Sequence, residues 1–351
     1  MCKKLLLVFF ITVIGGIVLC AGVTAAVDPF FVFHAPLSRF PYEIDNQLTQ
    51  NPGMARHFSY DSAIIGSSMT FNFDTRDFEE RMGLHTIKLS YSGAYTRDDA
   101  IILEQIFTRE GIKEIFIPID IVSFGAEPEE TKFPVPYSYY DRNPFNDIPY
   151  LLNKDVLLQY IIKPLMQPEP TPLHAVYAET WRQEEEYDAV RVLSQFTPSP
   201  VRKEETARES LNAQAKVNLD ANLIPFIEAH PETTFTFFFP PYSILFWYDL
   251  AREKRLDATL DACVYVAGEL LRYDNVRVFY FQDMEEYITD LDNYADYSHY
   301  HPDMNRYMTA CFADGIREIK SAEELRERTG HLALVTERFD YEALMEMPEQ
   351  Q

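Results

Sequence analysis

The stretch SAIIGSSMTFNF, residues 62–73, leaves an apolar run through Gly66 and two adjacent serines before it turns polar and aromatic. Such a transition is typical of a buried strand that ends in a tight turn and continues into a helix. The serines are either small residues of that turn or a nucleophile presented at the carboxyl end of the strand. Which interpretation is better depends on what the rest of the 351 residues place beside them.

Four further runs of β-branched and aromatic residues follow this one. Residues 86–89, 114–119, 233–239 and 276–281 are such runs, and segments with helical apolar spacing, such as 97–110, lie between them. Strands that are apolar along their length and alternate with helices indicate a parallel sheet covered on both faces. We therefore predict an α/β fold, a three-layer α/β/α sandwich whose five-stranded parallel sheet has the order 2-1-3-4-5.

The same pattern suggests how the exported part of the chain is organised. We predict one α/β domain over residues 28–330, with the last helix over 302–322. Residues 125–211 break the alternation and hold a large share of the prolines, so we interpret them as an insertion or cap on the core. Residues 331–351 are interpreted as an acidic C-terminal tail.

The first 27 residues predict a membrane anchor. Residues 5–27 carry no charge and follow Lys3 and Lys4. As a helix they would be about 34 Å long, against a bilayer core of about 30 Å. The lysines favour a cytoplasmic N-terminus with the remaining chain outside. A cleaved secretion signal is the alternative, because residues 24–26 are small, although the apolar run exceeds the usual signal core of roughly 7–15 residues. Both interpretations export the domain.

Charge and cysteine content narrow the function classes. The net charge of −24 argues against nucleic acid as a partner and favours a neutral or cationic substrate. Cys263 and Cys311 either form a disulfide or remain two buried thiols. No Cys-x-x-Cys or His-x-x-x-His spacing points to a metal, so neither a metal nor another cofactor is predicted.

Candidate catalytic residues follow several of the predicted strands. Ligands bind at the carboxyl ends of the strands in a doubly wound sheet. Ser68 follows the first strand, and Asp296 and His299 follow the fifth in the motif Asp-x-x-His. A serine hydroxyl needs a base, and that base needs a partner that fixes its tautomer. We predict Ser68 as nucleophile, His299 as base and Asp296 as the orienting acid.

An ester reaction also needs donors for the oxyanion. Gly93, after the second strand, would let its backbone approach closely, and the N–H of Ser68 lies at a turn into a helix. These two backbone groups are the predicted donors, and the side chain of Asn72 is a candidate third donor.

In this arrangement the chain resembles the SGNH (GDSL-type) hydrolase superfamily over most of residues 60–320. Ser68 matches the nucleophile of the first block, Gly93 the oxyanion glycine of the second, and Asp296 and His299 the Asp-x-x-His of the last. The resemblance is closest to the membrane-anchored, extracytoplasmic branch. That branch includes the D-alanyl transfer protein of teichoic-acid modification and the alginate O-acetylation proteins, which act on cell-surface polymers.

The third block departs from the family pattern. Gly-x-Asn-Asp, whose asparagine donates to the oxyanion, is absent, and IPIDIVSF at 117–124 occupies its place. An ionised Asp120 cannot donate a hydrogen bond. Either the two backbone donors suffice, or a side chain such as Asn72 substitutes, or the protein is no longer a hydrolase.

The resemblance implies a cell-surface serine esterase or O-acyltransferase that acts on acyl groups of an extracellular polysaccharide. The protein would be single-pass in the cell membrane, with its domain extracytoplasmic. Its partners would be a polysaccharide or acyl-ester substrate and the membrane; whether a multi-spanning membrane protein supplies the acyl group stays open. The alternative is a non-catalytic scaffold that binds glycan or assembles a polysaccharide export or modification complex.

Overall fold

The computed structural model describes residues 2–167 and 186–346, and the chain forms two compact units. Unit 1 comprises Met1–Ser59, Gln105–Arg109 and Phe133–Ala178, and unit 2 comprises Tyr60–Glu104, Glu110–Lys132 and Glu179–Gln351. This division differs from the predicted single domain over 28–330. Much of the predicted insertion at 125–211 belongs with the N-terminal segment, because Tyr139, Tyr150 and Tyr160 pack against Phe30.

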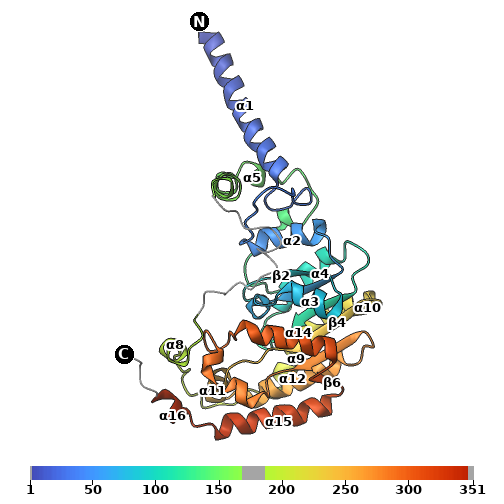
Figure 1. The fold of residues 1–351 in the computed structure, drawn as a ribbon, viewed down its shortest axis with the longest axis vertical. Helices are drawn as coiled ribbons and strands as arrows, with labels where there is room; N and C mark the ends of the chain where they lie inside the picture. The colour runs from blue at the N-terminus through green and yellow to red at the C-terminus, as the bar shows by residue number, and fades with distance from the viewer. Residues whose placement is uncertain (1, 168–185, 347–351) are drawn as a thin grey trace. The chain divides into compact units, whose positions relative to one another are not determined.

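Unit 2 contains a six-stranded, mostly parallel sheet (Figure 1). Its strands are β1 (Ser62–Gly66), β2 (Thr86–Ser90), β3 (Glu114–Pro118), β4 (Thr234–Phe239), β5 (Val276–Tyr280) and β6 (Glu318–Ile319). Their order is β2-β1-β3-β4-β5-β6, and only the pairing of β5 with β6 is antiparallel. The α/β class is confirmed, but the count of five strands is wrong. The two-residue β6 was missed because it contains no apolar run.

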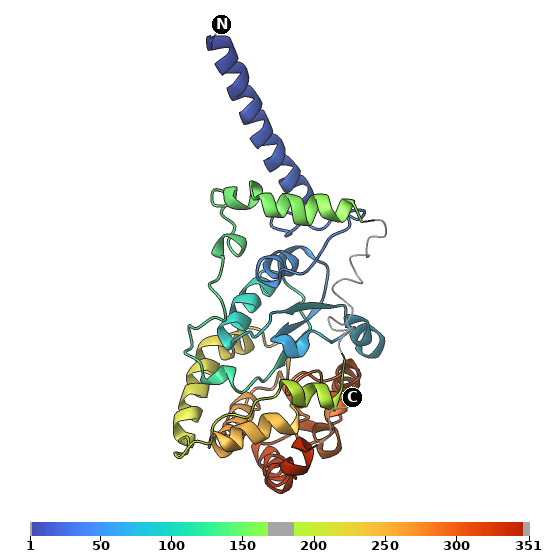
Figure 2. The same ribbon diagram turned by 90° about the vertical axis from the view of Figure 1, so that its left-hand side faces the viewer.

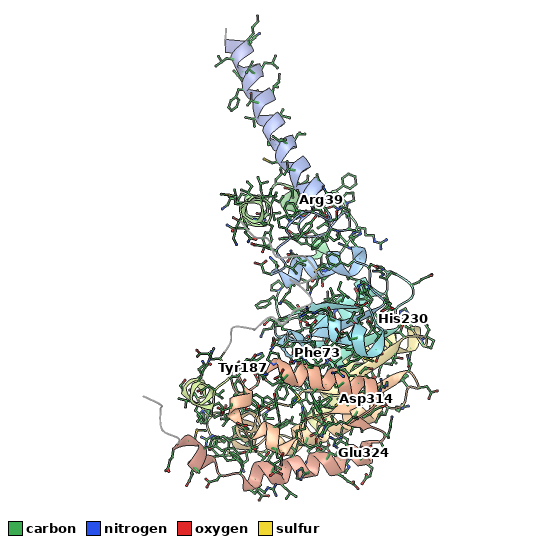
Figure 3. All side chains as sticks on the ribbon, in the orientation of Figure 1. Arg39, Phe73, Tyr187, His230, Asp314 and Glu324 are labelled. Atoms are coloured by element: carbon green, nitrogen blue, oxygen red, sulfur yellow. The ribbon has the colours of Figure 1, made fainter. Side chains whose placement is uncertain are left out.

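Aromatic packing fixes one face of this sheet. Helix α3 (Thr75–Met82) packs with α14 (Pro302–Asp314). The Phe78 ring lies 4.7 Å from Phe116 of β3, and Phe312 lies 5.0 Å from Phe279 of β5, between ring centroids. Phe73 is fully buried among these side chains (Figure 3). The residues that follow the Gly-Ser-Ser turn therefore belong to the core, which anchors the turn.

The remaining helices of unit 2 connect the strands or follow them. They are η1 (Ser68–Thr70), α4 (Thr96–Ile106), η2 (Ser123–Gly125), α8 (Ala189–Gln195), α9 (Arg208–Asn222), α10 (Ile224–Ala229), α11 (Ile244–Arg252), α12 (Leu256–Leu270), α13 (Glu285–Ile288), η5 (Leu291–Asn293), α15 (Ala322–Arg338) and α16 (Tyr341–Met345). Helix α12 packs against both α9 and α15.

The C-terminal region differs from its prediction. The helix predicted over 302–322 ends at Asp314, because Gly315 adopts a left-handed conformation with φ of 69°. Helix α15 then crosses the boundary predicted for an acidic tail at residue 331. Its Leu332 and Val335 are buried, so this stretch carries the apolar face of a docked helix. The many acidic residues on the exposed face obscured that pattern.

Unit 1 is mainly helical. It contains α1 (Cys2–Val27), α2 (Gln47–His57), η3 (Tyr137–Tyr139), α5 (Ile148–Leu151), the π-helix η4 (Val156–Ile162) and α6 (Lys163–Leu165). A small core of Phe30, Tyr150 and Val156 holds these segments together. Helix α1 is long and apolar enough to be a single membrane span or a signal sequence.

The two cysteines of unit 2 are both free and buried. The disulfide considered from the sequence is therefore not formed. Burial raises the pKa of the Cys263 thiol and that of the Cys311 thiol. A thiol that stays protonated is a poor nucleophile, so neither residue is a candidate for covalent chemistry.

Candidate active site

The turn after β1 can be formed only by glycine at position 66. Gly66 has φ of 110°, and a Cβ there would lie 2.4 Å from Cδ of Pro118 on the neighbouring strand. The chain turns at this point into η1, where the Oγ of Ser67 accepts a hydrogen bond from the backbone N–H of Met69. Ser67 is buried, whereas Ser68 is partly exposed. The turn thus separates two adjacent serines into a structural one and an accessible one.

The loop after β5 and η5 is shaped by its own aspartate. Oδ1 of Asp296 accepts hydrogen bonds from the backbone N–H groups of Ser298 and His299, both at 2.9 Å. The hydroxyl of Tyr300, which is buried, donates to the backbone carbonyl of Met69 at 2.9 Å. This bond ties the loop to η1, so the position of His299 is coupled to that of the serine turn.

Ser68, His299 and Asp296 form one hydrogen-bonded chain. Oγ of Ser68 lies 2.8 Å from Nε2 of His299, and Nδ1 of His299 lies 2.6 Å from Oδ2 of Asp296. Burial by itself would raise the pKa of Asp296, but the hydrogen bonds and charge of His299 and the backbone N–H groups outweigh it and lower that pKa. Asp296 is therefore ionised at neutral pH and can hold the imidazole with Nε2 toward the serine.

Asp120, which follows β3, accepts hydrogen bonds from two side-chain hydroxyls. The hydroxyls of Ser67 and Tyr242 both donate to its carboxylate, one to each oxygen. Burial raises the pKa of Asp120, and these hydroxyls and His299 offset part of the rise. With both oxygens occupied, Asp120 acts as an acceptor that fixes the buried serine of the turn. It is a positioning residue for the segment that presents Ser68.

Gly93 lies in the loop that follows β2, the strand next to β1. Gly66 pairs in register with Ser90, and the N–H of Tyr91 donates to the carbonyl of Gly66 at 2.8 Å. Gly93 has φ of 70°, and a Cβ there would lie 3.0 Å from Cε of Lys132. The left-handed backbone conformation thus favours glycine at position 93, and this position lies close to the side chain of Lys132. Its role as an oxyanion donor stays a prediction.

Asn72 follows η1 and is buried, with 7% of its surface exposed. Burial alone does not place its amide beside Ser68, so its assignment as a third oxyanion donor also stays a prediction.

The hydrogen bonds that Ser67 and Tyr242 donate to Asp120 were not predicted from the sequence. The available signal was positional, because Tyr242 follows β4 after Pro240 and Pro241, and Asp120 follows β3, the neighbour of β4 in the sheet. A hydroxyl and a carboxylate at the ends of adjacent parallel strands are candidates for contact even without a motif.

The described residues place no group of three or more His, Cys, Asp or Glu side chains where they could hold a metal ion. Comparisons of this chain with protein-family models, curated proteins and solved structures give no match.

Proposed function

We propose that this protein is an SGNH-type serine esterase or O-acyltransferase of the cell surface. One observation carries the proposal: the continuous chain from Ser68 through His299 to Asp296, with contacts of 2.8 and 2.6 Å. A scaffold that only bound glycan would not need a partly exposed serine, an imidazole and an ionised carboxylate in register. Esters are the proposed substrates because the sequence resembles the SGNH hydrolases, and the serine and imidazole supply the nucleophile and the proton carrier that ester cleavage needs.

In the proposed reaction, Ser68 Oγ attacks the carbonyl carbon of an acyl ester. His299 Nε2 takes the hydroxyl proton, and the resulting imidazolium is stabilised by Asp296. Collapse of the tetrahedral intermediate breaks the ester bond, and His299 returns the proton to the departing alcohol. The acyl group is then bound to Ser68 as an ester.

A second nucleophile completes the cycle. Water or a sugar hydroxyl gives its proton to His299 and attacks the acyl-enzyme, after which the proton returns to Ser68 Oγ. Water gives hydrolysis, whereas a sugar hydroxyl gives transfer of the acyl group to a polysaccharide. The N–H groups of Ser68 and Gly93 are the proposed donors to the oxyanion in both steps.

The net charge of unit 2 favours a neutral substrate. Unit 2 has 23 Lys and Arg residues against 48 Asp and Glu residues. A polyanionic polymer that approached this unit within a Debye length of about 8 Å would be repelled by the excess of negative charge. We infer a neutral glycan hydroxyl as the acyl acceptor, with α1 holding the protein in the cell membrane and unit 2 outside the cell.

The alternative is a non-catalytic scaffold for a polysaccharide export or modification complex. One observation favours it: Asp120 stands where the resembling family has a donating asparagine, and its oxygens accept instead. Under that alternative, glycan binding would be unchanged by Ser68→Ala and no acyl ester would be turned over.

The decisive experiment is covalent labelling of the full chain with a fluorophosphonate. We expect one adduct on Ser68, lost in Ser68→Ala and kept in Ser194→Ala, an exposed serine of α8. Comparing the O-acyl content of surface polysaccharide in cells with the wild-type protein, with Ser68→Ala and with no protein then separates the two functions. A defect in the deletion alone, with no adduct on Ser68, would favour the scaffold.

A further inference from the structure

The C-terminal end of α1 is built into unit 1. The carboxylate of Asp28, which is fully buried, accepts hydrogen bonds from the backbone N–H groups of Val32, Phe33 and His34 at 2.7–3.0 Å. The hydroxyl of Tyr150 donates to the same carboxylate at 2.8 Å. Helix α1 is therefore fixed to the segment that contains α5 and is not joined to it by a loose linker.

Contact between α1 and the rest of unit 1 begins near Cys20. Residues 5–19 are exposed along the whole helix, and their side chains stand free in Figure 3. From Cys20 to Val27 most side chains are partly or fully buried, and α1 contacts α5 and η4. Figure 2 shows the green segment of α5, η4 and α6 running across the end of α1. These short helices lie beside the last two turns of α1.

The free part of α1 is too short to cross a bilayer alone. Residues 5–19 are 15 residues and rise about 22 Å, whereas the hydrocarbon core is about 30 Å thick. The missing 8 Å or so corresponds to about five more residues of helix, which brings the hydrocarbon boundary to about residue 24. Any tilt of α1 increases the deficit. A bilayer that α1 crosses must therefore reach the level of α5 and η4.

The side chains at that level are apolar and exposed. The exposed set comprises Phe145 (87%), Ile148 (58%), Leu152 (44%), Leu158 (48%), Ile162 (41%), Leu165 (61%) and Met166 (78%). On the other side of η4, Val156 and Ile161 are buried. A helix that is apolar on both faces needs an apolar environment on each of them. Water on the outer face would leave that requirement unmet.

Charge distinguishes this unit from the rest of the chain. Outside α1, unit 1 has six Lys and Arg against seven Asp and Glu, whereas unit 2 has 23 against 48. Lys154 and Lys163 are exposed beside the apolar set, where Lys154 pairs with Asp155 at 3.3 Å and Lys163 with Glu43 at 3.4 Å. Such surface ion pairs are weak, so the long side chains can exchange these carboxylates for lipid phosphates. Unit 1 can therefore approach an anionic lipid surface without the repulsion that unit 2 would meet.

We propose that Phe145 and the segment from α5 to Met166 form a membrane-binding surface that lies in the outer interface of the bilayer crossed by α1. The occupant is lipid: the acyl-chain boundary covers the exposed apolar side chains, and the headgroups meet the flanking lysines. The anchor thus consists of one spanning helix and one interfacial layer, which together restrict tilt and rotation of unit 1. The inference is independent of the chemistry proposed for Ser68.

The test uses tryptophan fluorescence of the full chain in phosphatidylcholine vesicles with brominated acyl chains. The emission of the wild-type chain, which has two tryptophans of its own, is subtracted from that of each variant. Leu165→Trp introduces an indole on the proposed surface, and Leu334→Trp on α15 is the matched control, since these leucines are 61% and 60% exposed. We expect the indole of Leu165→Trp to be quenched about twofold or more by bromolipid and shielded from aqueous acrylamide. The indole of Leu334→Trp should show the opposite pattern.

A second variant, Met166→Trp, guards against local misfolding of the first and should behave like Leu165→Trp. Equal bromolipid quenching at the tested and control positions would overturn the proposal. So would full acrylamide access at Leu165→Trp and Met166→Trp in lipid alone, a result that would indicate a protein partner for this surface. Circular dichroism of each variant verifies that the helices are retained.

Discussion

Each unit of this protein contains a buried aspartate carboxylate, and the two carboxylates differ in the groups that donate hydrogen bonds to them. In unit 1, Asp28 accepts three backbone N–H groups and a tyrosine hydroxyl, and the result is a rigid joint at the end of an apolar helix. In unit 2, Asp120 accepts two hydroxyls, and one of them belongs to the turn that presents Ser68. Similar chemistry fixes an anchor in one unit and a candidate nucleophile in the other.

The units also differ in charge. The chain has a net charge of −24, but unit 1 with α1 carries +1 and unit 2 carries −25, from eight basic against seven acidic residues and 23 against 48. A whole-chain average therefore hides a neutral unit attached to an acidic one. The proposed partners differ accordingly between the two units: lipid for unit 1, and a neutral, ester-bearing substrate for unit 2.

The largest effect is expected from Ser68→Ala. The variant removes the nucleophile, so turnover of a p-nitrophenyl acyl ester should fall by about 10⁴-fold or more. Ser194→Ala, in the same unit, should keep full activity. If Ser68→Ala kept an activity within tenfold of wild type, Ser68 would not be the nucleophile, and unit 2 could not be called the catalytic unit.

Asp296→Asn should lower the turnover slightly less than Ser68→Ala does. The amide cannot stabilise the imidazolium of His299 and can favour the wrong tautomer, which lowers kcat by about 10³–10⁴-fold while KM changes little. Steady-state kinetics measure both constants. A change in KM alone would indicate that Asp296 only shapes the loop.

The paired substitutions Asp120→Asn and Asp28→Asn test the comparison of the two carboxylates directly. Asp120→Asn leaves the hydroxyl of Ser67 or Tyr242 without its acceptor, so the turn that presents Ser68 is held less precisely and kcat should fall about 10- to 100-fold. Asp28→Asn should leave kcat unchanged. Any substantial loss of activity in Asp28→Asn would show that the joint in unit 1 controls the site.

In unit 1 the expected effect of Asp28→Asn is on local stability. The amide keeps one acceptor oxygen and tolerates the positive φ of 49° at this position, but Phe33 and His34 lose their charged acceptor. Hydrogen exchange of these two amides should accelerate about tenfold, as expected for a loss of about 1.4 kcal/mol. The amides of Ser298 and His299, measured in the same sample, are the control and should not change.

The smallest effect concerns pH. The folded-state pKa of Asp296 is lowered, so its contribution to stability is complete above the unfolded pKa of about 3.9 and is lost as the pH falls below it. The pKa of Asp120 is raised, so the folded state binds its proton more tightly and the contribution falls as the pH rises from about 3.9. Between pH 3 and 6, roughly, the Tm difference from wild type should therefore change in opposite directions for Asp296→Asn and Asp120→Asn. If the Tm differences of the two variants changed in the same direction with pH, the opposite pKa shifts of Asp296 and Asp120 would be contradicted.

Much of unit 2 could be predicted from the sequence. The continuous apolar strands identify a parallel sheet, and the order of chemical residues along those strands points to Ser68, Asp296 and His299. Such features are local, because strand periodicity and an Asp-x-x-His turn are determined by residues a few positions apart. The hydrogen bond between Ser68 and His299 joins residues 231 positions apart and is not determined by these local patterns. It depends on the loop after η5, which the hydroxyl of Tyr300 ties to the carbonyl of Met69.

Unit 1 could not be predicted in this way. The sequence determined that an apolar helix begins the chain and that residues 125–211 differ from the α/β pattern. Only the tertiary structure decided that Phe30 stacks on Tyr150, 5.5 Å between ring centroids, and so joins the N-terminal segment to the insertion. It also decided that both oxygens of Asp120 accept hydroxyls. Both results are contacts between residues more than 50 positions apart, and their free energy depends on packing and burial, which no local pattern of residues encodes.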